Sequence, residues 1–320
     1  MKIAQECIAP KVQWVEITED NSEQRLDNFL ITLLKGVPKS CIYRIVRKGE
    51  VRVNKGRVDI KYRLAVGDIV RVPPVRRAET LDHVPHLSKG MADLLKQSIL
   101  FEDNAFLVIN KPSGLAVHGG SGVDSAVIEG FREINPEQRF LELVHRLDRD
   151  TSGCLLIAKK RSALRALHEQ FRDDTVSKTY LALLSGQWTK KEAVVNQPLL
   201  KNVSKGGERV VVINPLGKQS ETLFKRLKLY PDATLVRVEP KTGRTHQIRV
   251  HAAFLNHPII GDERYGLNQP NKLFKDKGYK KMFLHAETLA FLHPGTGENV
   301  TFSAPLPQHF NTYIDNEEEI

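Results

Sequence analysis

The sequence predicts an α+β protein made of a small N-terminal domain and a larger C-terminal one. Candidate strands outnumber candidate helices in the larger part, and the two do not alternate regularly, which favours a mixed, largely antiparallel sheet over a doubly wound fold. The smaller part carries two short amphipathic helices followed by basic strands. A polar stretch that begins at Pro73 and Pro74 separates the two parts and is typical of a linker.

Two helices are expected early in the chain. The apolar face of the first repeats at helical spacing: Leu26, Phe29, Leu30, Leu33 and Leu34. Gly36 ends this helix and Pro38 opens the next. In the second helix Ile42, Ile45 and Val46 face inward, which leaves its basic residues for the surface.

Basic strands follow these helices. Residues 51–58 alternate apolar and basic side chains around an Asn-Lys-Gly turn, which predicts a hairpin, and residues 66–72 supply a further turn and strand. Residues 25–77 hold 14 of the 48 Lys and Arg but only 4 of the 38 Asp and Glu, so they carry the whole net charge of +10. A generally basic surface is the simpler explanation, but it would not confine the surplus to one segment. The concentration favours a nucleic-acid contact.

The larger part contains elements of both kinds. The segments expected to be strands are 106–110, 141–145, 154–158, 179–184 and 234–238. The segments expected to be helices are 162–171 and 244–255. The last residues, 309–320, form an acidic tail, in which residues 315–319 are expected to fray.

Composition limits the class of protein. The chain has 320 residues and 41% hydrophobic content, as expected of a soluble globular protein with a sizeable core. No apolar run approaches the roughly 20 residues that cross a bilayer, and the N-terminus lacks the apolar core of a signal peptide. Cys7, Cys41 and Cys154 form no Cys-x-x-Cys pair, which favours reduced thiols over disulfides or zinc. We therefore expect a cytoplasmic protein.

The most informative string is residues 145–153, His-Arg-Leu-Asp-Arg-Asp-Thr-Ser-Gly. It places Asp148 among cationic and hydroxyl side chains, so we expect an ionised carboxylate that can act as a nucleophile or a base. A single Asp-x-x-Thr string more often caps a turn or a helix. Two later segments favour a functional site instead.

Three segments together resemble the motifs of the RluA-type pseudouridine synthases. Residues 145–153 match the family's HRLDxxTSG signature at every fixed position. Residues 178–183 look like its Lys-x-Tyr motif, and residues 243–251 are similar to its GRTHQIRVH motif. The resemblance runs from roughly residue 99 to residue 307, and the N-terminal helices and basic strands resemble the S4 RNA-binding domain.

The resemblance implies a small S4-type RNA-binding domain followed by a pseudouridine synthase catalytic domain. The implied parts are an N-terminal extension (1–22), the S4 domain (23–75), a linker (76–98), the catalytic domain (99–308) and an acidic tail (309–320). The residues that the S4 resemblance places on RNA are Arg44, Arg47, Lys48, Arg52, Lys55 and Arg57.

The resemblance also assigns roles in the catalytic domain. Asp148 matches the catalytic aspartate, and Arg249 matches the arginine that pairs with it. Tyr180 matches the tyrosine that packs on the target base. Arg146 matches the residue that fills the gap left by the extruded nucleotide, a task that suits a planar guanidinium. Without the motifs, Tyr180 would more often be a core residue and Arg249 a solvated helix residue.

The expected activity is the isomerisation of specific uridines to pseudouridine. Residues 36–40 and 142–145 are most similar to the branch of the family that acts on large-subunit (23S) ribosomal RNA. The N-glycosidic bond breaks and the base is re-attached through C5, with Asp148 acting either as a nucleophile at C1′ or as a base at C2′ that gives a glycal. The alternative is an S4-type RNA-binding ribosome assembly factor, which the intact Asp148, Tyr180 and Arg249 disfavour.

No cofactor and no metal are expected, because no atom enters or leaves overall. The chain has no Walker loop and no Gly-x-Gly-x-x-Gly. His246, His251 and His257 share no helical face at i, i+4, which disfavours a metal site. The expected partner is large-subunit ribosomal RNA or its assembly intermediates. We expect no membrane, no obligatory protein partner and a monomer.

Overall fold

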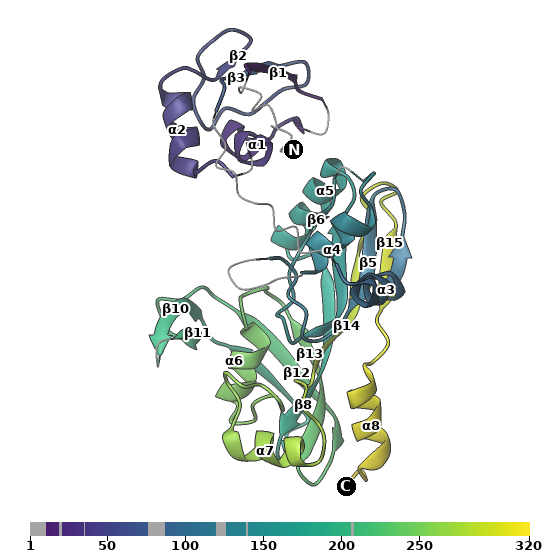
Figure 1. Cartoon of the computed structure of the whole chain (residues 1–320). Coiled ribbons are helices and arrows are strands. Elements are labelled where there is room, and N and C mark those ends of the chain that lie inside the picture. Colours follow the sequence, from purple (N-terminus) through teal and green to yellow (C-terminus); the bar gives the residue numbers. More distant parts are fainter. Residues whose placement is uncertain are drawn as a thin grey trace, which may run out of the picture. The chain divides into compact units, whose positions relative to one another are not determined.

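The computed structural model describes residues 11–18, 21–34, 36–75, 87–119, 126–138, 140–205 and 208–320. The chain divides into two compact units, Met1–His86 and Leu87–Ile320 (Figure 1). Most of the expected N-terminal extension and the first part of the expected linker, residues 76–86, lie outside the described residues. Among the described helices, none is long and apolar enough to cross a bilayer.

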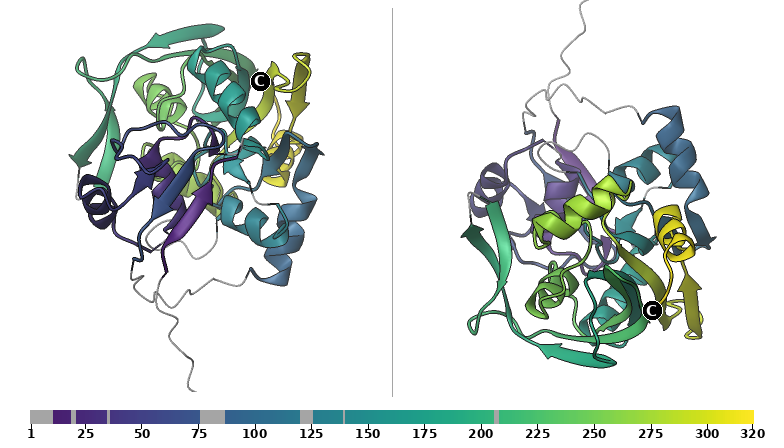
Figure 2. Two further views of the ribbon diagram at one scale, coloured as in Figure 1. Left: turned by 90° about the horizontal axis from the view of Figure 1, so that it is seen from above. Right: turned by 90° about the horizontal axis from the view of Figure 1, so that it is seen from below.

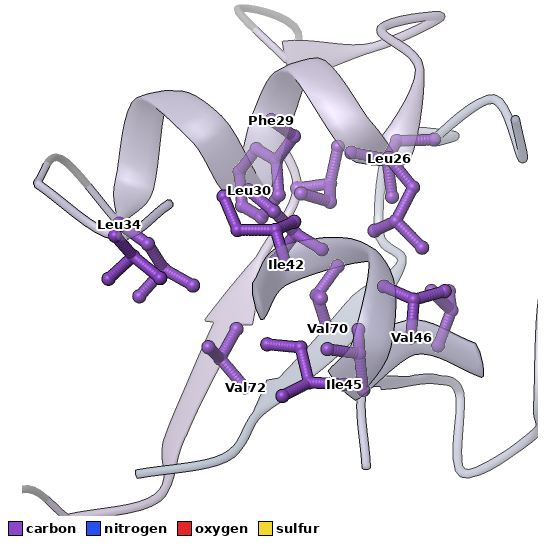
Figure 3. Packing of buried hydrophobic residues seen from close by; sticks show 14 residues of the cluster. Leu26, Phe29, Leu30, Leu34, Ile42, Ile45, Val46, Val70 and Val72 are labelled. Atoms are coloured by element: carbon purple, nitrogen blue, oxygen red, sulfur yellow. The ribbon is translucent and has the colours of Figure 1, made fainter. Parts of the chain in front are cut away.

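The first unit has two layers. Its elements are β1 (Gln13–Glu16), α1 (Leu26–Leu33), α2 (Lys39–Arg47), β2 (Arg52–Val53) and β3 (Ile69–Val72). The strands form an antiparallel sheet in the order β1-β3-β2, and both helices pack on one face of it. Figure 3 shows the apolar residues of the helices gathered around Val70 and Val72 of β3. Every residue predicted to face inward on α1 and α2 lies in or against this core, which confirms both amphipathic patterns.

The Asn-Lys-Gly turn forms, but its second arm is not a strand. Val53 and Gly56 exchange backbone hydrogen bonds of 3.1 and 2.9 Å across the turn. The chain then leaves the sheet, and β2 pairs with β3 instead. The side chain of Asn54 joins the turn to β3, because it donates to Asp68 Oδ1 (2.7 Å) and accepts from the backbone N–H of Ile69 (2.9 Å).

The second unit is built around one large sheet. Its helices are α3 (Lys89–Gln97), α4 (Val127–Ile134), α5 (Arg161–Arg172), α6 (Gln247–Phe254), α7 (Asn268–Asp276) and α8 (Gln308–Asn316). Its strands are β4 (Ile99–Glu102), β5 (Phe106–Lys111), β6 (Glu142–Leu143), β7 (Ser152–Ala158), β8 (Ser177–Ser185), β9 (Glu192–Asn196), β10 (Leu199–Lys205), β11 (Glu208–Ile213), β12 (Glu221–Leu229), β13 (Ala233–Pro240), β14 (Leu284–Leu292) and β15 (Asn299–Ser303).

The large sheet is mixed and largely antiparallel, as predicted. Its strand order is β4-β5-β7-β14-β8-β13-β12-β9, while β15 pairs with β14 and β6 with β7. Within the described ranges the one parallel pairing joins β7 to β14. Strands β10 and β11 form a separate antiparallel hairpin. Figures 1 and 2 show this hairpin and α8 on opposite sides of the second unit.

Helices cover both faces of the large sheet. Along β8, Ala182 packs with Ile248 of α6, whereas the neighbouring Leu181 packs with Phe310 of α8 on the other face. In the other half of the sheet, α3 and α4 lie on the face that α6 shares, and α5 covers the opposite face. Tyr180 of β8 packs against the clusters under both α4 and α6. It therefore lies where the two halves of the sheet meet.

Two helices lie where the sequence predicts irregular chain. Helix α3 occupies part of the expected linker, where the Ser88 hydroxyl accepts from the N–H of Met91 (3.3 Å) and Leu95 is buried against α4. Helix α8 occupies most of the expected acidic tail, and it ends at Asn316, within the segment 315–319 that is expected to fray. Phe310 and Tyr313 are buried there, one helical turn apart. The acidic residues that follow dominate the composition of this segment, so the short apolar pattern that indicates a helix is easily missed.

Candidate active site

A pocket of about 120 Å³ opens where the two halves of the large sheet meet. It is lined by the loop before β7, by β8, by the turn before α6 and by α6 itself. Four predicted residues of the second unit line it together: Arg146, Asp148, Tyr180 and Arg249. The fold thus unites three motifs that are far apart in the sequence.

The loop that carries Asp148 is held in a tight turn. The carbonyl of Asp148 accepts from the N–H of Thr151 at 3.2 Å. Gly153 follows with a φ of 110°, and a Cβ there would lie 2.2 Å from the carbonyl oxygen of Ala286 on β14. Only glycine allows β7 to start this close to β14, so the last residue of the motif sets the position of the loop.

Lys111, at the end of β5, anchors the same loop. Its side chain is fully buried, and its Nζ donates to the carbonyl oxygens of Arg149 (3.0 Å), Pro112 (2.8 Å) and Leu115 (2.9 Å). Burial lowers the pKa of Lys111 to about 7, while two nearby carboxylates oppose the shift. An ammonium group has three N–H donors, so the charged form satisfies all three carbonyls.

Arg249, in the first turn of α6, is shared by two carboxylates. Its Nη1 donates to Asp148 Oδ2 at 2.9 Å, while its Nε and Nη2 donate to the two oxygens of Asp262 at 2.7 and 2.8 Å. Burial alone would lower the pKa of Arg249, but Asp262 and then Asp148 raise it above its ordinary value. The bidentate pair with Asp262 fixes the plane of the guanidinium, and this plane aims Nη1 at Asp148.

Asp262 is fixed in the loop between α6 and α7. Its Oδ1 accepts from the backbone N–H groups of Arg264 (2.9 Å) and Tyr265 (3.0 Å), and the residue is 1% exposed. Burial would raise the pKa of Asp262, but the hydrogen bonds and charge of Arg249, aided by these N–H groups, lower it overall. A buried, ionised Asp262 therefore supports Arg249 from the side opposite Asp148.

His246 faces the other oxygen of Asp148. Its Nε2 lies 3.7 Å from Asp148 Oδ1, and its Nδ1 lies 2.7 Å from the hydroxyl of Tyr265. That hydroxyl accepts from the N–H of Val211 on β11 (3.0 Å), so its own proton is directed to Nδ1. Burial lowers the pKa of His246, which keeps the ring neutral near pH 7. The remaining ring proton is then on Nε2, toward Asp148.

The turn before α6 is locked by a buried glutamine. The Oε1 of Gln247 accepts from the hydroxyl of Thr242 (2.7 Å) and from the N–H of Arg244 (3.0 Å). Its Nε2 donates to two groups of β12, both at 2.9 Å. The amide of Gln247 therefore makes four hydrogen bonds. These bonds hold the start of α6 in the orientation that places Arg249 in the pocket.

Tyr180 reaches the pocket from the sheet. The residue is half-buried, and burial, together with the charge of Asp148, raises the pKa of Tyr180 above its ordinary value. The side chain is therefore a neutral phenol near pH 7. It offers a flat ring and a hydroxyl to a planar ligand, and it is a poor source of phenolate for proton removal.

The two residues that open the first motif differ in surroundings. Arg146 is exposed and lines the pocket. The Nε2 of His145 accepts from the N–H of Leu156 (3.1 Å), and its ring stacks on Phe171 at 5.0 Å. Burial lowers the pKa of His145 to about 4, and the charge of Lys178 adds to the shift. His145 thus holds the loop to β7 as a neutral acceptor, and Arg146 is available to a ligand.

The three histidines that were considered as metal ligands point to separate partners. His246 faces Asp148, His251 Nδ1 lies 2.8 Å from the hydroxyl of Thr222, and His257 Nδ1 lies 2.8 Å from a carbonyl oxygen of β8. Within the part of the chain that the structure describes, no three or more His, Cys, Asp or Glu side chains gather as a metal site.

The basic residues predicted to contact RNA in the first unit are all exposed: Arg44, Arg47, Lys48, Arg52, Lys55 and Arg57. They do not all line one groove. Arg44 and Arg47 of α2 line a groove of about 430 Å³ together with Arg57. Arg52 points outward from β2, because the next residue, Val53, is buried in the core.

Sequence reasoning missed Lys111, Asp262 and Tyr265. An available signal for the last two is the segment 261–266, where glycines flank an acidic residue directly after an apolar run. His246 lies inside a recognised motif but was considered only as a metal ligand. These residues act through the motif residues, and their roles become visible only when the fold brings them together.

The pocket holds a carboxylate aimed by a buried arginine, beside a neutral tyrosine on a mixed sheet, and comparison with known proteins identifies the class of enzyme. The family model of RNA pseudouridylate synthase matches residues 105–254, and the S4 domain model matches residues 24–70. The chain belongs to the RNA pseudouridylate synthase family.

Individual relatives narrow the class. "Ribosomal large subunit pseudouridine synthase C" of Yersinia pestis is 57% identical over 297 residues, which cover 93% of each chain. The protein of the same name from Escherichia coli (strain K12) is 56% identical over 303 residues, covering 93% of this chain and 94% of its own.

Two solved human structures share the fold. "RNA Pseudouridylate Synthase Domain Containing 4" has a TM-score of 0.59 and 26% identity, and the match covers 71% of this chain and 95% of that one. "RNA Pseudouridylate Synthase Domain Containing 1" has a TM-score of 0.56 and 30% identity, covering 66% of this chain and 83% of that one.

Proposed function

We propose that this protein isomerises specific uridines of large-subunit (23S) ribosomal RNA to pseudouridine, with Asp148 as the catalytic carboxylate. The observation that carries the proposal is how Asp148 is held. Arg249 engages Oδ2 at 2.9 Å, whereas Oδ1 lies 3.7 Å from His246 Nε2, beyond hydrogen-bond distance, and is the oxygen offered to the substrate. The names of the bacterial relatives support ribosomal RNA as the substrate.

The reaction needs a single carboxylate at the ribose. The bond between C1′ and N1 breaks, the uracil turns, C5 bonds to C1′, a proton leaves C5, and N1 ends with a proton. Asp148 assists either by attacking C1′ or by removing the C2′ proton to give a glycal, and both routes use a carboxylate oxygen that faces the ribose. Glycosidases that activate water need a second carboxylate for it. Here water must be kept out, which agrees with an Asp148 side chain that is only 17% exposed.

The other pocket residues are assigned by what their side chains offer. Arg249 orients Asp148 and balances part of its charge. Tyr180 supplies a flat ring against the uracil, and its raised pKa argues against a role as a phenolate base. The exposed Arg146 takes the place of the flipped nucleotide in the RNA stack, since a guanidinium plane replaces part of the lost stacking.

The proposal also covers the RNA substrate, the cell compartment and the oligomeric state of the enzyme. The substrate is large-subunit ribosomal RNA or an assembly intermediate, in the cytoplasm, and the enzyme acts as a monomer without a bound cofactor or protein partner. The basic first unit tethers the RNA. A ribosome assembly factor without activity is not favoured, because the family match extends through the three motifs and the pocket side chains are mutually aligned.

The test is pseudouridine mapping on unmodified large-subunit ribosomal RNA incubated with purified protein, without metal or nucleotide. We expect modification at discrete uridines and none with Asp148→Asn. Modification that survives in the Asn variant would remove Asp148 from the reaction. Absence of modification by the natural protein on any rRNA form or assembly intermediate would reject the substrate.

A further inference from the structure

The first unit presents an exposed tryptophan beside two arginines. Trp14 on β1 is 57% exposed. It lies directly opposite Arg71 on β3, and Arg71 lies directly opposite Arg52 on β2. Directly opposed residues of antiparallel strands project from the same face of a sheet. Trp14, Arg71 and Arg52 therefore form one row across all three strands, here called the outer row.

The outer row lies on the face turned away from the helices. Val70 and Val72, on either side of Arg71, are buried among residues of α1 and α2, as Figure 3 shows. Side chains alternate along a strand, so Arg71 points to the opposite face. The groove lined by Arg44 and Arg47 is a separate feature, because its lining does not include Trp14, Arg52 or Arg71.

The two arginines of the outer row repel each other and so lower the stability of the folded unit. Like charges directly opposite one another across a sheet are destabilising. Arg71 donates through Nη1 to the carbonyl of Glu50 (2.6 Å), and Arg52 donates through Nε to the carbonyl of Gly49 (3.3 Å). Among the described residues, neither guanidinium forms an ion pair with a carboxylate. Each bond uses one of the five donors of a guanidinium, and a bound anion would relieve the repulsion.

The indole supplies the second half of a ligand site. Unpaired RNA bases stack on exposed aromatic rings, while guanidinium groups bind the adjoining phosphates. Glu16, the next outward residue on β1, lies opposite Ile69 and repels phosphate on that side. The sugar–phosphate backbone of a ligand stacked on Trp14 must therefore pass on the arginine side. The two guanidiniums beside the indole favour unpaired nucleic acid over an apolar peptide, although Ile69 on the same face is also 45% exposed.

We propose that Trp14, Arg71 and Arg52 form a second RNA-binding site of the first unit, which stacks one unpaired nucleotide on the indole and holds its phosphate with the two guanidiniums. This site rests on the proposed function, because its ligand is taken to be the RNA on which the enzyme acts. Trp14 lies before residues 24–70 that match the S4 domain, so strand β1 adds this site to that domain.

Tryptophan fluorescence tests the site directly. The chain has two tryptophans, and the other one, Trp188, is 4% exposed in the second unit. In the full-length Trp188→Phe variant all tryptophan emission comes from Trp14. We expect quenching as a single-stranded oligouridylate of about ten nucleotides binds, half-maximal at the Kd measured by anisotropy. A duplex of equal length should quench much less.

Binding of the labelled oligonucleotide to variants in the natural background gives a second measurement. Trp14→Ala should bind roughly tenfold more weakly, and Trp14→Phe should recover most of the affinity, because stacking needs only an aromatic ring. Arg52→Gln or Arg71→Gln should each lower the slope of log Kd against log salt by about one. Val66→Ala is the matched control, because Val66 is 58% exposed in the same unit and lies outside the row.

Two outcomes would overturn the proposal. One is unchanged Trp14 emission at saturating RNA. The other is equal affinity of the Trp14→Ala and Trp14→Phe variants. A misfolded Ala variant would bind more weakly than the Phe variant, so equal affinity also shows that the Ala variant is folded. Pseudouridine formation is measured on the same preparations. If the natural protein modifies ribosomal RNA while Trp14 stays silent, only this site is rejected, whereas failure to modify any RNA rejects the proposed function.

Discussion

At the scale of single residues, the site depends on one guanidinium held by two carboxylates. Removing one partner of a buried ion pair commonly costs about 3–5 kcal/mol, because the remaining charge is left buried. Asp262 touches no part of the pocket in which uracil would lie, and yet it holds Arg249 by two bonds where Asp148 has one. Its role is therefore to position Arg249.

We predict that Asp262→Asn lowers kcat by about tenfold to a hundredfold, because a neutral amide cannot hold the guanidinium plane. RNA affinity should stay within about twofold, since Asp262 lies beneath the site, and urea unfolding should show a loss of about 3 kcal/mol. Glu263→Gln is the control, because that side chain is 80% exposed and pairs with Lys275 at the surface. Unchanged kcat in a folded Asp262→Asn protein would contradict the positioning role.

A second residue-scale prediction concerns acid stability. His145 has a pKa of about 4 in the fold, lowered by burial, against an ordinary value of 6.5. Between these values the unfolded chain binds a proton that the folded chain does not, so His145 stabilises the fold fully above pH 6.5, and this contribution is lost as the pH falls to about 4. Between pH 6.5 and 4 the natural protein loses part of its free energy of unfolding because His145 must be protonated. In the His145→Gln variant this loss should be smaller by about 2–3 kcal/mol. Parallel pH profiles of the two proteins would argue against this.

At the scale of elements, the parallel contact between β7 and β14 positions the loop that carries Asp148. Gly153 is the residue at which the two strands approach, and its φ of 110° is a second reason for glycine. The contact fixes the start of β7, and Asp148 lies only a few residues before it. Packing of the sheet and placement of the carboxylate are thus linked through one residue.

We predict that Gly153→Ala destabilises the protein by more than about 3 kcal/mol, because the strands must separate or the backbone must adopt another φ. Gly90→Ala is the matched control. Gly90 lies in α3 with nothing within 4 Å of an added Cβ, so alanine should leave stability unchanged or raise it by up to about 1 kcal/mol. Equal thermal denaturation midpoints for the two variants would contradict the prediction.

Local patterns and long-range contacts were predictable to different degrees. The faces of α1 and α2 follow from spacing alone, and the three motifs identify Asp148, Tyr180 and Arg249. The parallel pairing of β14 with β7 could not be predicted, because pairing partners more than a hundred residues apart leave no local pattern. Asp262 escaped notice for the same reason. Its bond to Arg249 depends on how α6 and the following loop fold back.

At the scale of the whole molecule, charge and chemistry lie in different units. Residues 25–77 carry the net charge of +10, whereas the pocket belongs to Leu87–Ile320. Under the proposed function, the first unit supplies long-range, salt-sensitive attraction to RNA, and the second supplies recognition of the target uridine. Because these two tasks lie in different units, one unit can be removed or mutated without changing the task of the other.

We predict that a fragment beginning at Leu87 folds and binds ribosomal RNA more weakly, with a smaller dependence on salt. The cut precedes Ser88, which caps α3, so the core of the second unit stays intact. The slope of log Kd against log salt, measured for the fragment and the full chain, checks this. An unchanged slope would mean that the first unit does not contact the RNA.

The most direct test of the central claim is release of tritium from C5 of labelled uridine in ribosomal RNA, because the C5 proton leaves only when the base has been re-attached through C5. With enzyme in excess, we predict release by the natural protein and none above background by Asp148→Asn or Asp148→Ala, although both variants bind the RNA with the natural Kd. Release by either variant at more than about a thousandth of the natural rate would contradict the assignment of Asp148, since loss of an essential carboxylate should cost more than about 4 kcal/mol of transition-state stabilisation.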